Sequence, residues 1–292
     1  IAHPVSRIDL LNELKKSKLI GQTLDGKKIY LYDYTEDSIV LKELGRLREV
    51  SFRKVGEGVN KKRDTDKYDI YYQHIILWDE NDLEIVGSYR VGNSDFIFKN
   101  IGVKGFYSNT LFKYNEEFTP YLKDSIELGR SFVQPKYWGT RALDYLWFGI
   151  GAYLRTNPNI KYMFGPVSMS ATFPTVAKDM MIFYYSHYYG NNENLIEPKV
   201  PYSYSNNLNE IKEIFDLNDK KKDFKFLKST LANIGVSIPT LYKQYSDITE
   251  DNGIKFLGFN VDNNFADCID GFILVEVAKI KDNARQRYIN KV

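Results

Sequence analysis

The sequence predicts an α/β protein built on a mixed β-sheet with helices on both faces. Two apolar runs, residues 71–78 and 85–91, are joined by the turn Asp79-Glu80-Asn81-Asp82, which is typical of a β-hairpin. After this hairpin, strand-like segments alternate with segments long enough to be crossover helices. Apolar residues make up 43% of the 292 residues, which is enough to form a sizeable core.

Before the hairpin, the pattern predicts a helix, a strand, a second helix and a long loop. Apolar side chains recur at helical spacing within residues 8–14, and residues 28–34 alternate like a strand. The second helix opens at Ser38 and places Arg48 and Phe52 on one face, because they are four residues apart. Residues 54–69 are polar and contain glycine, and loops of this length inside a domain are usually functional or disordered.

After the hairpin, we expect a strand at 96–101, a connector at 115–123 and a strand at 125–133. A helix ending near Arg155, a strand at 161–167 and a helix at 171–189 follow. Residues 190–235 are rich in Asn, Lys and Asp and predict a lid or insertion with a small helix near 208–215. A helix at 241–245, strands at 254–261 and 272–277, and a basic tail at 279–291 complete the chain.

Glu127, Arg130 and Ser131 lie within the otherwise apolar strand 125–133. Burying a charge without a partner is costly, so Glu127 and Arg130 indicate a paired arrangement. The pair is either a structural ion pair that ties the strand to a neighbour or part of a functional site, and the spacing alone favours neither interpretation.

Composition excludes several classes of protein and partner. The net charge of +2 is too small to indicate nucleic acid binding, and the short basic runs at 61–63 and 220–222 are typical of solvated loops, or of contacts to an acidic carrier protein or anionic lipid. Cys268 is the one cysteine, which excludes an intramolecular disulfide and fits a reducing compartment. No run of ~18 apolar residues predicts a membrane-spanning helix.

Several familiar kinds of catalytic motif are absent from the sequence. The three histidines, His3, His74 and His187, have no His or Cys at metal-ligand spacing, so no metal is expected. There is no Walker loop, Gly-x-Gly-x-x-Gly or Gly-x-Ser-x-Gly motif. His74 and Asp79 match His-x-x-x-x-Asp, but residues five apart on a strand point to opposite faces. Positioning, proton removal and oxyanion stabilisation remain as the expected chemistry.

A series of short motifs nevertheless occurs in one order along the chain. These motifs are Arg46-Leu47-Arg48-x-x-x-Phe52-Arg53, Asp64-x-Asp66-x-x-Asp69, His74, Ile85-Val86-Gly87-Ser88-Tyr89-Arg90, Phe106-Tyr107-Ser108, Glu127-Leu128-Gly129-Arg130-Ser131-Phe132-Val133 and Phe164-Gly165-Pro166-Val167-Ser168. The series continues at 238–245 and 261–265. It resembles the ornithine-lipid type of N-acyltransferase that depends on acyl carrier protein, also called hemolysin-like, which is related to GNAT acetyltransferases and to acyl-homoserine-lactone autoinducer synthases.

The resemblance implies a GNAT-like, mixed and splayed sheet with a C-terminal extension. The acyl-phosphopantetheine arm of acyl carrier protein, or of acyl-CoA, would lie beside the strand 125–133 as the donor, with no permanently bound cofactor. The implied catalytic residues are Glu127, His74 and Arg130. The implied substrate-binding residues are Arg48, Phe52, Asp66, Asp69, Arg90 and Ser131, and the acyl or pantetheine slot is assigned to Phe106, Phe132, Val133 and Trp138.

One segment departs from the ordinary GNAT pattern. Those enzymes bind the pyrophosphate of coenzyme A with a Gln/Arg-x-x-Gly-x-Gly/Ala loop. Here the corresponding run is Gln134-Pro135-Lys136-Tyr137-Trp138-Gly139-Thr140-Arg141, with one glycine and bulky rings. This departure favours the thioester of acyl carrier protein as the donor.

The implied reaction is transfer of a long-chain fatty acyl group to the amine of an amino acid, in aminolipid synthesis. Glu127 is the first candidate for the general base and His74 the second, while Arg130, with Arg48, would bind the acceptor's carboxylate or orient Glu127. Ornithine, glycine, glutamine and lysine remain open as acceptors. The structural alternatives are that Asp66 and Asp69 cap a turn, that Arg90 is a surface charge, and that Trp147 belongs to the core rather than to an acyl tunnel.

Two other functions stay open as alternatives to this one. They are an autoinducer-type synthase that uses S-adenosylmethionine and a non-catalytic, hemolysin-like membrane-associated protein. The long extension at 190–280 argues against the first, and the lack of a strongly amphipathic membrane segment argues against the second.

The expected organisation is an N-terminal linker and helix (1–36), an acyltransferase core (37–189), a lid or insertion (190–235) and C-terminal strands completing the same domain (236–292). Residues 1–5 resemble a linker that follows a lysophospholipid-acyltransferase-like domain, so a fragment of a fusion protein is expected. We expect a bacterial cytoplasmic enzyme with peripheral membrane contact.

Overall fold

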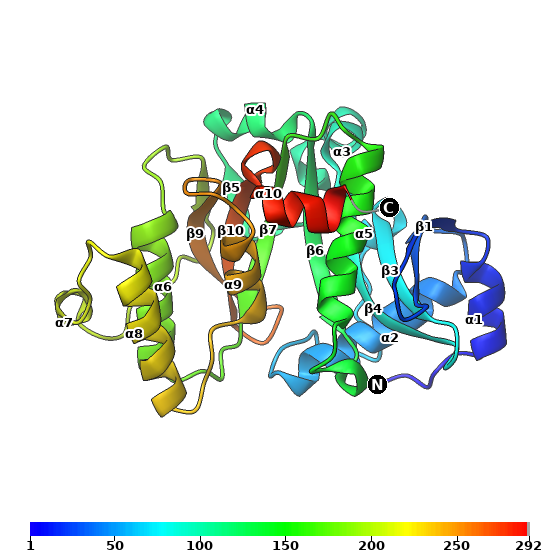
Figure 1. The fold of residues 1–292 in the computed structure, drawn as a ribbon, viewed down its shortest axis with the longest axis horizontal. Helices are drawn as coiled ribbons and strands as arrows, with labels where there is room; N and C mark the ends of the chain where they lie inside the picture. Colours follow the sequence, from blue (N-terminus) through cyan, green and yellow to red (C-terminus); the bar gives the residue numbers. More distant parts are fainter. Residues whose placement is uncertain (291–292) are drawn as a thin grey trace.

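Eight strands form one sheet in the computed structural model, which describes residues 1–290 (Figure 1). All neighbouring strands in it are antiparallel except β6 and β7, which are parallel. In spatial order the strands are β1 (Lys18–Gln22), β2 (Lys28–Tyr32), β3 (Gln73–Asp79), β4 (Glu84–Asn93), β6 (Ser125–Val133), β7 (Tyr162–Met169), β10 (Cys268–Glu276) and β9 (Ile254–Asp262). A second, two-stranded sheet pairs β5 (Phe112–Tyr114) with β8 (Ile196–Pro198).

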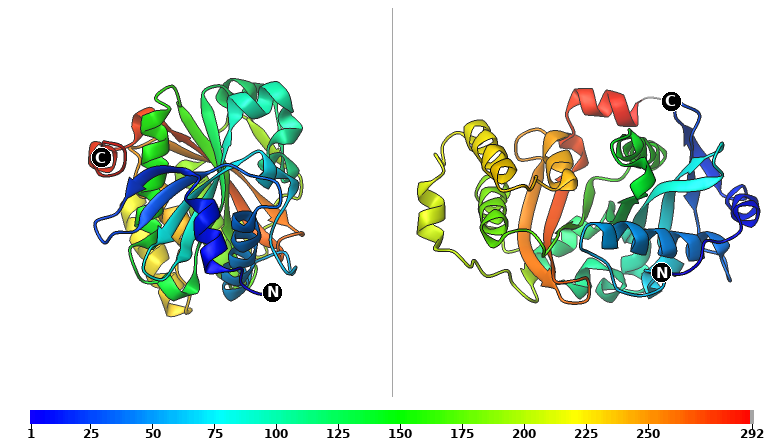
Figure 2. Two further views of the ribbon diagram at one scale, coloured as in Figure 1. Left: turned by 90° about the vertical axis from the view of Figure 1, so that its right-hand side faces the viewer. Right: turned by 90° about the horizontal axis from the view of Figure 1, so that it is seen from below.

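Helices cover both faces of the large sheet, and α2 and α5 lie on opposite sides of its strands (Figure 2). The helices are α1 (Arg7–Leu14), α2 (Ile39–Lys54), α3 (Ser94–Asn100), α4 (Thr119–Leu122), α5 (Ala142–Thr156), α6 (Thr175–Tyr189), α7 (Leu208–Glu213), α8 (Lys220–Asn233), α9 (Thr240–Asp247) and α10 (Asp282–Ala284). Short turns of helix are η1 (Lys67–Ile70), η2 (Val103–Gly105), η3 (Ser108–Thr110), η4 (Glu116–Phe118), η5 (Pro135–Tyr137), η6 (Val277–Lys279) and the π-helical η7 (Arg285–Ile289). The predicted mixed α/β fold is confirmed.

The predicted hairpin and central strand owe their burial to this two-sided cover. The large core cluster combines Ile75, Val91 and Leu128 with the inward face of α5. The opposite cluster combines Ile76 and Phe132 with residues of α1 and α2. Strands buried on both faces read as nearly continuous apolar runs, which explains the strength of their signal in the sequence.

The strand expected at 96–101 is wrong, because this segment is helix α3. Asn93 caps the helix by accepting a hydrogen bond from the Phe96 amide at 3.0 Å. Of the apolar run, Ile97 is buried, whereas Phe96 and Phe98 are exposed. The run therefore resembled a strand in composition, while the cap and the single buried position fit a helix.

The chain beyond residue 190 is more regular than expected. In addition to the small helix α7, the segment 190–235 contains β8 and α8. Asp219 starts α8 by accepting the amides of Lys221 and Lys222, each at 3.0 Å. The expected basic tail contains α10 and η7, and η7 is held on α5 by Arg287 Nη2 and Tyr288 OH, which donate to Asp144. Residue 291, the last of that expected tail, lies outside the described residues.

The N-terminal segment contributes more than a linker and a helix. β1 and β2 lie within residues 1–36 and extend the large sheet beyond β3. At the opposite end, β9 and β10 join the same sheet through β7. No helix within residues 1–290 is long and apolar enough to cross a membrane.

Gly151 is where α5 meets the C-terminal turn most closely. A Cβ atom at this position would lie 1.8 Å from the Tyr288 carbonyl oxygen, which is backbone and cannot rotate away. We therefore expect Gly151→Ala to displace η7 and to lower the free energy of unfolding by about 1–3 kcal/mol. Denaturant unfolding and limited proteolysis of the C-terminal segment measure this. Gly21→Ala is the control, because its Cβ would make an ordinary 3.6 Å contact with Ile29.

Candidate active site

The central strands β6 and β7 run together for only a short distance and then separate. Their paired residues are Ser125–Glu127 of β6 and Tyr162–Phe164 of β7. At Gly165, with φ of 149°, a Cβ would lie 2.1 Å from the Leu128 carbonyl oxygen, so glycine is required where the strands part. Beyond that point the sheet is splayed, and β6 loses its partner on this edge within the described chain.

A bulge in β6 turns Arg130 toward the gap. On β4, Ser88 is opposite Phe132 and Arg90 is opposite Gly129, so two residues of β6, Arg130 and Ser131, face one residue of β4. Arg130 has φ of 46°, in the left-handed region. Bulges redirect side chains in this way and are frequent beside active sites.

Two adjoining hollows occupy the splay. The inner cavity, about 100 Å³, is lined by residues that include Tyr107, Gly129, Arg130, Phe265 and Asp270. The outer groove, about 560 Å³, lies between the end of α2, the end of β6 and the start of α9. Both hollows are lined by Phe52, Glu57, Ser131, Ser168 and Leu241. The groove therefore leads directly to the inner cavity.

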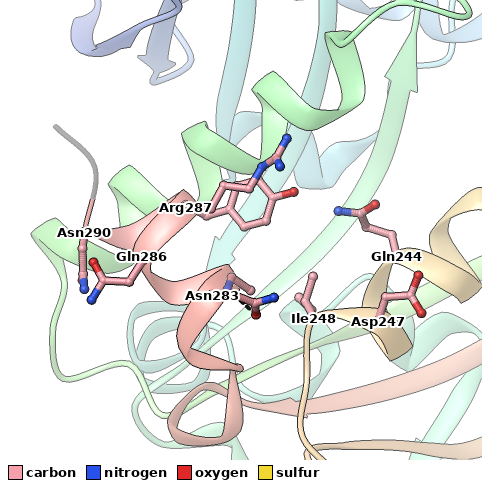
Figure 3. Close-up of a pocket in the computed structure, with 9 residues that line it drawn as sticks. Gln244, Asp247, Ile248, Asn283, Gln286, Arg287 and Asn290 are labelled. Atoms are coloured by element: carbon pink, nitrogen blue, oxygen red, sulfur yellow. Dashed lines mark hydrogen bonds between the residues drawn. The ribbon is translucent and has the colours of Figure 1, made fainter.

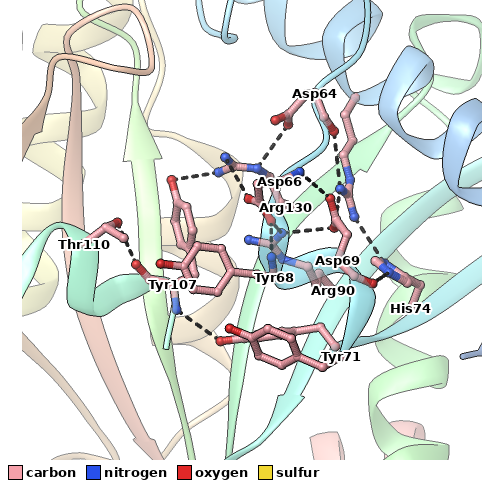
Figure 4. A network of polar contacts seen from close by, with 12 residues as sticks. Asp64, Asp66, Tyr68, Asp69, Tyr71, His74, Arg90, Tyr107, Thr110 and Arg130 are labelled. Carbon is pink, nitrogen blue, oxygen red and sulfur yellow. Dashed lines mark hydrogen bonds and ion pairs between the residues drawn. The ribbon is translucent and has the colours of Figure 1, made fainter. Parts of the chain in front are cut away.

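Three arginines and three aspartates form a network behind this cavity (Figure 4). Asp69 accepts from Arg48 Nη1 at 2.8 Å and from Arg90 Nη1 at 3.0 Å. Arg90 Nη1 also donates to Asp66 at 2.6 Å. Arg48 and Asp69 are fully buried, and Arg90 is 1% exposed, so Arg90 is no surface charge.

Arg130 joins this network to the cavity. Its Nε lies 3.0 Å from Asp64 Oδ2, and its Nη1 donates to the Tyr107 hydroxyl at 2.9 Å. The guanidinium also lies over the rings of Tyr107 and Phe265, at 4.5 and 5.0 Å from their centres. Arg130 is thus fixed from three sides while it lines the inner cavity.

Glu127 is 1% exposed and faces the loop between α3 and β5 rather than the cavity. Its carboxylate accepts the amides of Tyr107 at 3.0 Å and Ser108 at 2.6 Å, and the hydroxyls of Tyr72 and Ser108. Burial raises the pKa of Glu127 above its ordinary value, while the hydrogen bonds from Ser108 and Tyr72 act in the opposite direction. The carboxylate therefore holds the segment that carries Tyr107.

Two further carboxylates line the cavity, and neither was singled out from the sequence. Asp270 on β10 is 3% exposed and accepts from Ser168 Oγ at 2.6 Å. Glu57 lies between Gly56 and Gly58, which have φ of 76° and 108°. A Cβ on Gly56 would lie 2.8 Å from Thr172, so the loop packs tightly against the end of β7. This packing fixes Glu57 at the boundary between the groove and the cavity.

Comparison with known proteins assigns this arrangement to a family. Residues 47–148 match the family described as acetyltransferase (GNAT) domain. A glycine N(alpha)-acyltransferase of Phocaeicola vulgatus is 32% identical over 99% of this chain and 92% of its own length. The chain belongs to this family of N-acyltransferases. The acyltransferase class and the GNAT-like fold predicted from the sequence motifs are both confirmed.

Two other proteins match the acyltransferase over less of its length or at lower identity. An L-ornithine N(alpha)-acyltransferase of Brucella abortus is 32% identical over 43% of this chain and 46% of its own length. A solved CoA-dependent acyl-homoserine lactone synthase matches 80% of this chain and 77% of that chain, with 10% identity and a TM-score of 0.33.

Most residues assigned to the acyl or pantetheine slot lie along the groove of the acyltransferase. Phe132, Val133 and Trp138 line the outer groove, and Phe52 and Ser131 line both hollows. Phe106 does not line either hollow, because it is buried against Phe164 in an aromatic cluster below the sheet. Trp147 packs edge-on against Tyr245 and so belongs to the core rather than to an acyl tunnel.

His74, Asp66 and Asp69 of the acyltransferase belong to the arginine network and line neither hollow. His74 is fully buried, and its Nδ1 lies 3.1 Å from Arg48 Nη2. Burial and the charge of Arg48 lower the pKa of His74 to about 3, which keeps the ring neutral and weakly basic. Asp66 and Asp69 cap η1, since they accept the amides of Tyr68 and Asp66 at 2.9 Å each. They therefore cap a turn and hold arginines at the same time.

The signal for Asp270 was present in the sequence, whereas that for Glu57 was not. Asp270 is a charged residue inside the largely apolar strand Cys268–Glu276. The same pattern, a charge within an apolar strand, identified Glu127 as a candidate. The strand was expected to begin only at residue 272, which left Asp270 outside it. Glu57 follows α2 in a loop, and no local pattern indicates that this loop folds back onto β7.

A larger depression of the acyltransferase, about 770 Å³, lies between α9 and the C-terminal helical turns (Figure 3). Gln244, Asp247, Asn283 and Gln286 are among the residues that line it. It contains no buried charged group, and its Arg287 is paired with Asp144. No group of three or more His, Cys, Asp or Glu side chains suited to a metal occurs within residues 1–290. By contrast, the inner cavity of the splay is lined by the buried side chain of Asp270.

Proposed function

We propose that this acyltransferase transfers a long-chain fatty acyl group from the thioester of acyl carrier protein to the amine of glycine, in aminolipid synthesis. The observation that carries the proposal is the groove that leads into the splay and ends at Arg130. The relative that matches nearly the whole chain is named for glycine, and shorter matches are named for ornithine.

The donor thioester fits the outer groove. Phe52, Val55, Phe132, Val133 and Leu143 give the groove a largely apolar lining that suits an acyl chain and a pantetheine arm. The segment after β6 forms η5, and Tyr137 and Trp138 occupy the place of a glycine-rich pyrophosphate loop. This arrangement supports a carrier-protein thioester over coenzyme A. A long-chain product also supports peripheral contact with a membrane.

The acceptor fits the inner cavity. A volume of about 100 Å³ suits the smallest amino acid better than ornithine or lysine. Arg130 lines the cavity, and its Nη2 is only loosely paired, at 3.7 Å from Asp66 Oδ2. A guanidinium in this position can accept a carboxylate of the substrate as an additional partner.

The reaction needs a thioester carbonyl held beside the amine. Beyond Glu127, one edge of β6 has no strand partner within residues 1–290, so alternate amides on that edge point into the splay. Such amides can stabilise the oxyanion that forms when the amine attacks. The base implied by resemblance, Glu127, does not line the cavity, and we propose that it acts by positioning Tyr107, which contacts Arg130.

A product assay tests the proposal. The purified protein is incubated with palmitoyl acyl carrier protein or palmitoyl-CoA and with glycine, ornithine, glutamine or lysine, and products are identified by mass spectrometry. We expect N-acylglycine, with the carrier-protein donor turned over faster than the coenzyme A donor. S-adenosylmethionine is included as an acceptor. Formation of an acyl-homoserine lactone, or no acylated amine with any donor, contradicts the proposal.

A further inference from the structure

N-acyl transfer needs a group that removes a proton from the acceptor's ammonium, because only the neutral amine is nucleophilic. The residues implied by resemblance, Glu127 and His74, do not line the inner cavity. Two carboxyl groups do line it, those of Asp270 and Glu57. They come from opposite sides, Asp270 from β10 and Glu57 from the loop after α2.

The charged groups around the cavity favour a cationic ligand. Behind it, Arg48, Arg90 and Arg130 are matched in number by Asp64, Asp66 and Asp69. The carboxyls of Glu57, Asp262 and Asp270 are additional, and the same Arg130 is the cation that acts on each of them. A site with more carboxyls than cations is suited to an ammonium group.

Asp270 has a carboxylate oxygen available to such a ligand. Its Oδ1 accepts from Ser168 Oγ, while its Oδ2 has no hydrogen bond or ion pair to any residue in 1–290. Asp270 is nevertheless buried, with 3% of its surface exposed, and it lines the inner cavity. Glu57 is half-buried, and its carboxylate likewise makes no hydrogen bond or ion pair within the described residues. Because both residues line the inner cavity, these oxygens are open to a ligand there rather than to a partner in the protein.

We propose that Asp270 and Glu57 form the site that holds the ammonium group of the acceptor and takes its proton. This inference rests on the proposed N-acyl transfer. Asp270 Oδ2 accepts one proton from the ammonium, which leaves a neutral amine facing the thioester. Glu57 lines both hollows, so it connects Asp270 with the outer groove and the solvent.

The proton and bond changes balance in the following way. The amine nitrogen forms a bond to the thioester carbonyl carbon, and the carbonyl becomes an oxyanion. When the carbonyl re-forms, the carbon–sulfur bond breaks and the pantetheine sulfur leaves with the electron pair. The second proton of the nitrogen passes to this sulfur and gives a free thiol. The first proton, held by Asp270, is released to solvent through the groove.

The acidities of the two groups support this role. Burial raises the pKa of Asp270 to about 7, with a smaller contribution from the charge of Asp262. Burial and the charge of Asp270 raise the pKa of Glu57 to about 8. The other titratable or charged groups that face this pair are Arg130 on β6, Asp262 on β9, Cys268 on β10, Tyr242 on α9 and Tyr107. A general base works best with a pKa near the working pH.

The test compares Asp270→Asn, Glu57→Gln and the wild type over pH 5.5–9. For the wild type, kcat/KM for glycine should rise through about pH 7, because the base must lose its proton before it can act. In Asp270→Asn this rise of kcat/KM with pH should disappear, and kcat/KM should fall about 10²–10⁴-fold. Glu57→Gln should mainly raise the KM for glycine. The Kd of a non-hydrolysable palmitoyl acyl carrier protein analogue should stay within threefold in Asp270→Asn.

A second acceptor separates proton removal from a structural role. Methoxyamine is already neutral over this pH range, so Asp270→Asn should acylate it at close to the wild-type rate. Asp251→Asn, on an exposed side chain paired with Lys220, is the control and should match the wild type throughout.

Two results would separate the failure of this inference from failure of the proposed function. A rise of kcat/KM near pH 7 that persists in Asp270→Asn, or equal losses with glycine and methoxyamine, would overturn the role of Asp270 alone. A wild type that acylates no amine with any donor would overturn N-acyl transfer itself.

Discussion

Replacing Asp69 with asparagine should lower the free energy of unfolding by about 3–5 kcal/mol. The substitution preserves the shape of the side chain but leaves Arg48 and Arg90 without the carboxylate that both contact, at 2.8 and 3.0 Å. All three side chains are almost completely buried, so water cannot replace the lost partner. Urea denaturation followed by circular dichroism measures the effect.

The Asp69 carboxylate should also make the free energy of unfolding depend on pH. Burial raises the pKa of Asp69, but the charges of Arg48 and Arg90 outweigh it and hold this pKa well below its ordinary value. The stabilisation is therefore present above about pH 4 and decreases as the pH falls further. Asp69→Asn should lose less stability than the wild type on acidification. A loss below about 1 kcal/mol at pH 7 would contradict the account, and Asp251→Asn should change stability by no more than about 0.5 kcal/mol.

Replacing Arg130 with lysine should reduce kcat/KM for glycine about 100-fold while the protein remains folded. Lysine keeps a positive charge near Asp64, but a single ammonium cannot also contact Tyr107 and present a second edge to the cavity. The loss should appear mainly as a higher KM for the acceptor, with donor binding unchanged. Steady-state kinetics with palmitoyl acyl carrier protein measure it.

A matched exchange elsewhere controls for the change of residue type. Arg7→Lys alters a guanidinium on α1 that is paired with Glu84 at 3.5 Å, where 61% of the arginine side chain is exposed. It should leave kcat/KM within about twofold, since surface pairs contribute little. If Arg130→Lys retained wild-type kinetics, the carboxylate role proposed for Arg130 would be wrong.

Local pattern was sufficient for the parts of the fold that are buried on two faces. The hairpin and the strand 125–133 form long apolar runs, so their existence and type follow from the sequence. The strand predicted at 96–101 was wrong because a run of adjacent apolar residues is typical of a buried strand, whereas here only Ile97 enters the core. β1 was missed because its residues are exposed or half-buried and give no periodic signal.

The site was predictable as a region but not as a set of contacts. Motif order indicated Arg130, which lines the inner cavity, and the slot around Phe132, which lines the outer groove. The partners of Arg90 could not be foreseen, since Asp66 and Asp69 are 24 and 21 residues away and belong to a loop. The position of Glu127 depends on how the segment at Tyr107 folds back, which no spacing reveals. The roles of Glu127, His74 and the substrate-binding residues remain predictions.

The short junction between β6 and β7 divides the wall of the cavity between two halves of the sheet. The stretch shared with the wider acetyltransferase family ends at residue 148, so it includes β6 and Arg130 but neither β7 nor β10. The two halves of the sheet meet through only three residue pairs and contribute opposite walls of the cavity. Substitutions on β7, β9 and β10 can therefore reshape the wall that carries Asp270 while β4 and β6, which carries Arg130, keep their own pairing.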